Sequence, residues 1–99
     1  MLNITNSIEN GKALVVPEGR LDTVTAPDFE KSVKEIIGEA NELTLDFGKL
    51  EYISSAGLRV LLSIQKSMID KGDMKIINTN EIVREVFDIT GFSDILTIE

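Results

Sequence analysis

YISSAGLRVLL, residues 52–62, is the stretch that decides the fold of this chain, because a short β-like segment stops there and an apolar helix begins. Ser55 lies at the junction, with a hydroxyl that we expect to be exposed. A helix start carries free N–H groups and the positive end of the helix dipole. A serine placed there can cap the helix, and it can also carry a phosphate. Ser55 is therefore either an N-cap or a switch, and residue type alone favours the cap.

The composition is that of one ordinary globular domain. The chain has 99 residues, 42% of them hydrophobic and 27% charged, which is enough for one hydrophobic core. No apolar run approaches the roughly 20 residues that a bilayer span requires. The first residues show no basic segment followed by an apolar one, so no secretory signal is predicted. The expected location is cytoplasmic.

Charge and residue usage exclude several functional classes. Ten Lys and Arg stand against 17 Asp and Glu, which gives a net charge of -7, so neither nucleic acid nor an anionic membrane surface is an expected partner. Cysteine and histidine are both absent, and with them disulfides, thiolate nucleophiles, imidazole bases and the usual zinc ligand sets. No Asp-x-Asp-x-Asp-Gly, Walker or Gly-x-Gly-x-x-Gly motif occurs. We expect no catalytic residues, no metal site and no resident cofactor.

The opening segment predicts an antiparallel hairpin. Alternating apolar residues in positions 2–8 precede Asn10-Gly11, a strong hairpin turn signal, and the β-rich run 13–16 follows. Pro17 and Gly19 predict an edge, a bulge or a strand end nearby, after which Leu21 leads into a loop.

Three helices are predicted from apolar residues at helical spacing. The first begins at Thr25 and ends at Gly38, the second runs from Ser55 to Gly72, and the third begins at the cap residue Asn80 and ends at Gly91. The predicted inward stripes are Phe29, Val33, Ile36 and Ile37; Leu58, Leu61, Leu62, Gln65, Met68 and Ile69; and Ile82, Val83, Val86 and Phe87.

Further strands are predicted at residues 42–47, 74–77 and 95–98. Residues 50–53, with the short β-like stretch Tyr52-Ile53, are expected to belong to the exit loop of the 42–47 strand rather than to a strand of their own. Strands that alternate with helices imply parallel crossovers. The predicted fold class is therefore α/β, with a mixed, mostly parallel sheet of about four to five strands packed with about three to four helices. The residues expected to form the shared core are Val33, Ile37, Leu45, Leu61, Leu62, Val86 and Phe87.

Two motifs in this order of elements resemble those of the STAS domain of bacterial anti-sigma factor antagonists, and the resemblance covers nearly the whole chain. They are GRLD, residues 19–22, and ISSAGL, residues 53–58. In that family the loop before the central helix usually reads Asp-Ser-Ser-Gly-Leu or Asp-Ser-Ala-Gly-Leu, and a partner kinase phosphorylates the first serine after the aspartate. Aligned on Ser-Ala-Gly-Leu, that serine is Ser55. Ser54 takes the place of the aspartate, and Asp22 matches the aspartate of the family's earlier loop.

The resemblance implies that Ser55 is the phosphoacceptor and that the kinase meets a surface made of Asp22, Thr23, Ser54, Ser55, Ala56, Gly57 and Arg59. Other interpretations follow from the residue types. Asp22 and Thr23 can simply form an exit turn. Gly57 can permit close backbone packing or leave the kinase room to reach Ser55, and Arg59 can be a solvated charge or pair with a phosphate.

By this resemblance, residues 1–99 are a single STAS domain that acts as an anti-sigma factor antagonist. Unmodified, it binds a serine kinase of the anti-sigma type, and phosphorylation of Ser55 releases it. ATP and magnesium belong to the kinase, a phosphoserine phosphatase is the second partner, and the chain is a substrate rather than an enzyme and a monomer on its own. The alternative is a STAS module for ligand sensing, scaffolding or lipid transport, with Ser55 unmodified. A small hydrolase that uses Asp22 and Ser55 would lack a base of suitable pKa.

Overall fold

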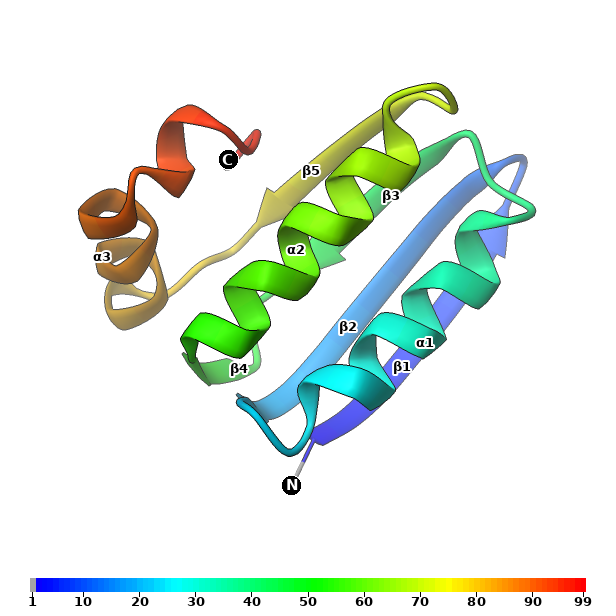
Figure 1. Cartoon of the computed structure of the whole chain (residues 1–99). Helices are drawn as coiled ribbons and strands as arrows, with labels where there is room; N and C mark the ends of the chain where they lie inside the picture. The colour runs from blue at the N-terminus through cyan, green and yellow to red at the C-terminus, as the bar shows by residue number, and fades with distance from the viewer. Residues whose placement is uncertain (1) are drawn as a thin grey trace.

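The chain forms one mixed five-stranded sheet, and α1 and α2 lie side by side over one of its faces (Figure 1). The structure is a computed structural model that describes residues 2–99. The strands are β1 (Leu2–Glu9), β2 (Lys12–Leu21), β3 (Glu42–Asp46), β4 (Leu50–Ile53) and β5 (Asp73–Ile77). The helices are α1 (Ala26–Ile37), α2 (Ser55–Met68) and α3 (Glu81–Thr90), and the 3₁₀ turn η1 (Phe92–Asp94) follows. The predicted α/β class and the predicted ranges of strand and helix numbers are confirmed.

The predicted hairpin is confirmed as β1 and β2, which pair in antiparallel register. Asn10 and Gly11 connect them with φ angles of 52° and 79°, the left-handed pair that a two-residue type I′ turn requires. The other pairings are parallel, and the strand order is β1-β2-β3-β5, with β4 paired to β2.

β2 is shared lengthwise between two parallel partners. Residues 12–15 pair with β3, whereas residues 19–21 pair with β4, with a register shift between Gly19 and Arg20. Pro17 lies between these two ladders, where β2 has no parallel partner, so its missing N–H interrupts neither of them. The predicted bulge is confirmed, but the strand does not end near Pro17. It runs on to Leu21.

Two predictions about strands were wrong. Residues 50–53 are not an exit loop but strand β4, because β2 extends beyond β3 and offers them an edge to pair with. Residues 95–98 do not form a strand, because the backbone turns after η1, with Leu96 N donating to Phe92 O at 2.8 Å. Only an isolated bridge between Ile98 and Ile76 remains of that pairing.

The core lies between the sheet and the helices. Of the predicted core residues, Val33, Ile37, Leu45, Leu61 and Phe87 are buried as expected. Leu62 and Val86 are only half-buried, and Ile69 and Ile82 of the predicted stripes are exposed. The apolar arc of α2 is wide, and the sheet and α1 cover only the part of it that contains Gly57, Leu58, Val60, Leu61, Ile64 and Met68.

Leu61 and Leu62 make a matched pair that tests this orientation of α2. Leu61 has no exposed surface, so Leu61→Ala should lower the free energy of unfolding by about 2–5 kcal/mol. Leu62→Ala removes the same atoms from a half-buried position and should cost clearly less. Urea denaturation of both variants measures this, with m-values checked for constancy. Equal losses would mean that α2 is rotated differently on the sheet.

Candidate functional site at the ends of β2 and β4

Most of the predicted site residues lie in two segments that leave the sheet side by side. β2 and β4 are parallel, Leu21 pairs with Ile53, and Ser54 N donates to Leu21 O at 2.9 Å. The strands β2 and β4 end at the same side of the sheet (Figure 1). The next residues along the two strands, Asp22 and Ser54, therefore follow neighbouring strand ends. Carboxyl ends of parallel strands are the usual place for binding residues in α/β proteins.

Asp22 organises the loop between β2 and α1. Its Oδ1 accepts hydrogen bonds from Val24 N at 3.0 Å and Thr25 N at 3.1 Å. Thr25 Oγ1 in turn accepts from Asp22 N at 2.9 Å and donates to Arg20 O at 2.8 Å. The backbone N–H of Thr25 is the main cause that lowers the pKa of the Asp22 carboxyl. Asp22 is therefore charged at neutral pH and builds the exit turn.

Thr25, at which the first helix was predicted to begin, differs from an ordinary cap residue. It does occupy the N-cap position of α1, but its side chain makes no cap hydrogen bond, because the hydroxyl is engaged with Asp22 and Arg20 instead. The hydrogen bonds of the Asp22 carboxylate all go to its own loop, and none joins it to Ser55 within residues 2–99. The geometry gives no support to a hydrolytic pair.

The two serines at the start of α2 have different environments. Ser54 occupies the N-cap position with φ -100° and ψ 177°, and Ser55 is the first helical residue, so the prediction that Ser55 caps the helix was wrong by one position. The Ser54 side chain makes no cap hydrogen bond, and its Oγ is enclosed without a partner in the described part of the chain. Ser55 is exposed. Of the two hydroxyls, only that of Ser55 is open to another protein.

Gly57 holds the first turn of α2 against the sheet. A Cβ on this residue would lie 2.7 Å from Ile53 Cγ1 and 2.9 Å from Leu21 Cγ, closer than carbon atoms pack. Both neighbours are core residues. Gly57 is itself buried and lies beneath the surface that the sequence predicted for the partner. Of its two interpretations, the structure supports close packing.

A hollow of about 300 Å³ separates the first turns of α1 and α2. Exposed Arg59, one turn after Ser55, borders it together with Glu30. A hydrogen bond with the Ser63 hydroxyl is the largest cause that lowers the pKa of Glu30, and a hydrogen bond with Lys34 is the second largest. Lys34 Nζ lies 3.1 Å from the Glu30 carboxylate. The remaining lining residues are Thr23, Ala26, Pro27, Ala56 and Val60.

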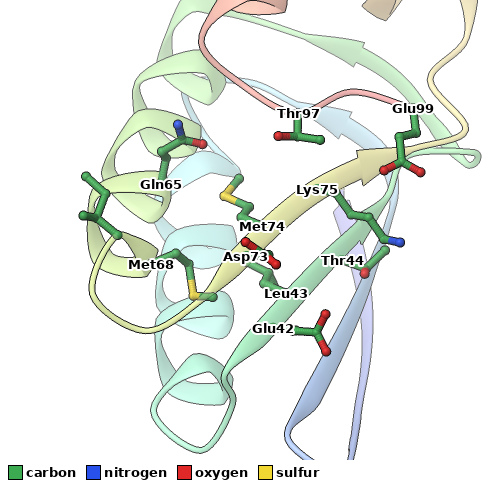
Figure 2. A pocket seen from close by; sticks show the side chains of 11 residues that line it. Glu42, Leu43, Thr44, Gln65, Met68, Asp73, Met74, Lys75, Thr97 and Glu99 are labelled. Carbon is green, nitrogen blue, oxygen red and sulfur yellow. The ribbon is translucent and has the colours of Figure 1, made fainter.

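A second hollow, of about 450 Å³, lies by the edge strand β5 and contains none of the predicted site residues. Figure 2 shows Gln65 and Met68 of α2, Lys75 of β5, and Thr97 and Glu99 of the C-terminal segment around it.

Sequence reasoning missed one residue of this region, Val24. It lies in the Asp22 loop and is 83% exposed. Periodicity could not single it out, because it belongs to no helix or strand. The only signal in the sequence is an apolar residue within a turn of otherwise polar ones.

No cluster of three or more acidic side chains that could hold a metal ion occurs among residues 2–99. None of the helices described is long and apolar enough to cross a membrane.

Comparison with known proteins places this geometry in a family. The model of the STAS domain matches residues 3–99. BtrV of Bordetella bronchiseptica, which bears the name of an anti-sigma factor antagonist, is 30% identical over 99 residues, 98% of this chain and 85% of BtrV. The crystal structure of an anti-sigma factor antagonist from Mycobacterium paratuberculosis superposes with a TM-score of 0.91 at 19% identity, covering 99% of this chain and 85% of that one.

The anti-sigma factor antagonist SpoIIAA has the same fold in two states. Its unphosphorylated form superposes with a TM-score of 0.75 at 14% identity, covering 98% of this chain and 87% of SpoIIAA. The phosphorylated form of SpoIIAA from Bacillus superposes with a TM-score of 0.74 at 15% identity, covering 98% of this chain and 91% of SpoIIAA. The predicted resemblance and the predicted fold are confirmed.

Gly57→Ala should destabilise the protein by about 1–3 kcal/mol through overpacking, although alanine favours a helix by about 1 kcal/mol over glycine. Gly38→Ala is the matched control, since a Cβ there would meet its nearest neighbour at 3.6 Å. The control should be neutral or stabilising in urea denaturation. A neutral Gly57→Ala would refute the close approach of α2 to β2 and β4.

Ser54→Ala should leave the free energy of unfolding unchanged or slightly raised, because it removes an enclosed hydroxyl that makes no hydrogen bond. Asn80→Ala is the comparison, since the Asn80 side chain accepts from Val83 N at 2.8 Å and so caps α3. Loss of that cap should cost about 0.5–2 kcal/mol. Thermal or urea denaturation of the two variants decides, and equal losses would show that Ser54 caps α2 in solution.

Proposed function

Since this chain belongs to the STAS domain family and its relatives there are anti-sigma factor antagonists, we propose that it is itself such an antagonist and that Ser55 is its switch. Unmodified, it binds an anti-sigma factor of the serine-kinase type and frees that kinase's other client. Phosphorylated on Ser55, it is released. A phosphoserine phosphatase resets it, and the exchange takes place in the cytoplasm.

The contrast between the two serines carries this proposal. A kinase must bring a hydroxyl oxygen in line with the γ-phosphorus of ATP, which an enclosed oxygen cannot reach. Ser54 Oγ is enclosed, whereas Ser55 is exposed and begins α2. The position of Ser54 also accounts for the family's usual aspartate at this place, because aspartate is among the strongest N-cap residues.

The chemistry divides between two proteins. The γ-phosphoryl group of ATP passes to Ser55 Oγ, the bond to the β-phosphate oxygen breaks, and ADP leaves. The hydroxyl proton goes to a base on the kinase, which also supplies ATP and magnesium. This chain contributes an accessible hydroxyl oxygen at a fixed place. It has no histidine or cysteine that could serve as the base for this step.

The first turn of α2 can accept the new charge without refolding. The helical ladder begins with Leu58 N donating to Ser54 O at 3.0 Å, so the amides of residues 55–57 precede it and face the helix start. These amides and the helix dipole favour an anion at this end. Arg59, one turn along the same helix, adds a positive charge within reach of Ser55.

Release then comes from the surface rather than from the fold. Phosphorylation adds about -1.5 to -2 charges at neutral pH, next to the loop that holds the charged carboxylate of Asp22. A surface that fits the kinase in its neutral form would have to bury this charge to bind again, and the loss of solvation opposes that. Support comes from SpoIIAA, which keeps this fold in both its unphosphorylated and its phosphorylated form.

The alternative is a ligand-sensing, scaffold or lipid-transport accessory module in which Ser55 stays unmodified. The hollow by β5 favours it to some degree, since about 450 Å³ lies within the usual range for small-molecule sites. Mass spectrometry of protein isolated from its native host, with and without phosphatase treatment, separates the two functions. A phosphate on Ser55 supports the switch, and its complete absence under all growth conditions supports the alternative.

Ser55→Ala should bind the kinase constitutively, because the hydroxyl that receives the phosphate is gone while the surface stays neutral. Ser55→Asp should bind at least tenfold more weakly, a loss of about 1.4 kcal/mol or more. Calorimetric titration of each form into the kinase measures both affinities. Because aspartate only partly mimics phosphate, stoichiometrically phosphorylated protein is titrated alongside.

Ser54→Ala serves as the control for that titration and should bind and become phosphorylated like the wild type. Phosphopeptide mapping accompanies the measurement. Equal affinities of the unmodified and phosphorylated forms would refute the switch, and a phosphate found chiefly on Ser54 would refute its assignment to Ser55.

A further inference from the structure

Val24 is an apolar residue held out into solvent beside the proposed switch. Its exposed fraction of 83% is the highest among the large hydrophobic residues in the described chain, ahead of Ile89 at 76%. Single exposed apolar residues are common and need no function by themselves. Two further observations set Val24 apart: how it is held, and where it lies.

The loop that carries Val24 is fixed by hydrogen bonds. Asp22 Oδ1 accepts from Val24 N at 3.0 Å and from Thr25 N at 3.1 Å, and Ala26 N donates to Asp22 O at 2.8 Å. A β-branched side chain has few rotamers. Binding of another protein at Val24 would therefore cost little conformational entropy, because the loop and the side chain are already ordered. This favours Val24 as a contact residue.

Val24 also belongs to the surface that a kinase must approach to reach Ser55. Thr23, directly before it, and Ala26, two residues after it, line the hollow of about 300 Å³ between α1 and α2, together with Ala56 and Arg59 from the first turns of α2. The polar groups here are the Asp22 carboxylate, the Thr23 hydroxyl and the Arg59 guanidinium, and the smaller apolar residues Pro27 and Ala56 lie among them. Val24 is the most exposed large apolar side chain of the described chain.

Interfaces obtain most of their affinity from a few residues that become fully desolvated in a largely apolar centre, surrounded by polar contacts that exclude water. We propose, on the basis of the function proposed above, that Val24 is the apolar anchor of this docking surface. It enters an apolar recess of the serine kinase while Ser55 points to the kinase's ATP. The occupant of the surface is thus a kinase with such a recess beside its active site, and the Val24 side chain contributes to the choice among kinases.

The test compares Val24 with Ile89, an apolar residue on α3 with nearly the same exposed fraction. Val24→Thr keeps the shape of the side chain and adds a hydroxyl, and should weaken calorimetric binding to the kinase at least about threefold, whereas Val24→Asp should weaken it at least about tenfold. The affinities of Ile89→Thr and Ile89→Asp for the kinase should stay within about twofold of the wild type. The affinity of Val24→Ile should do so too, because this substitution keeps an apolar side chain at position 24. Circular dichroism should show the native fold in all five variants, because both positions are exposed. The thermal midpoint should be unchanged in the three Val24 variants and should fall at most slightly in the Ile89 variants, because Ile89 lies in the last turn of α3, where threonine and aspartate are poorer helix formers and a negative charge is unfavourable.

The outcomes separate this inference from the function on which it rests. If the wild type binds the kinase and Ser55→Asp weakens binding, but Val24→Thr and Val24→Asp bind like the wild type, the anchor is refuted and the switch stands. Equal losses at Val24 and Ile89 would also refute the anchor. If the unmodified wild type does not bind the kinase at all, the proposed function itself fails.

Discussion

The close approach of α2 to the ends of β2 and β4 is the constraint on which the rest of the site depends. It exists because residue 57 has no Cβ, which would otherwise meet Ile53 Cγ1 at 2.7 Å and Leu21 Cγ at 2.9 Å. With the first turn of α2 pressed onto these two core residues, the Ser54 hydroxyl is enclosed and Ser55 faces solvent. Packing beneath the helix thereby selects which serine a partner can reach.

Local signals predicted much of the fold. Asn10-Gly11 marked the hairpin because few other residue pairs tolerate two positive φ angles, and helical spacing located α1, α2 and α3. The predictions that were wrong concern segments whose structure depends on pairing with strands far away in the sequence. Residues 50–53 are a strand only because β2 outruns β3, and residues 95–98 turn back after η1 instead of pairing along β5. Leu61 is buried and Leu62 only half-buried because of the way α2 is rotated on the sheet. A wide apolar arc does not specify that rotation.

The structure brings the two predicted site segments together, but the sequence did not predict the local geometry of their residues. Two adjacent serines fit a helix start equally well, and only the backbone angles of Ser54 show which one occupies the N-cap position. Asp22 was expected either to form a turn or to meet a partner, and the structure shows that it builds the turn that presents Val24. Val24 follows no periodic pattern, so its exposure became visible only in three dimensions.

The central claim is that phosphorylation of Ser55 changes a docking surface and leaves the fold intact. Two-dimensional ¹H–¹⁵N NMR of the labelled protein, before and after complete phosphorylation by its kinase, tests this most directly. We expect shifts in residues 22–26 and 54–59, at the ends of β2 and β4, and unchanged amides in β1, β3 and α3. Shifts that spread through the whole sheet would contradict a local switch and would point to a change of fold instead.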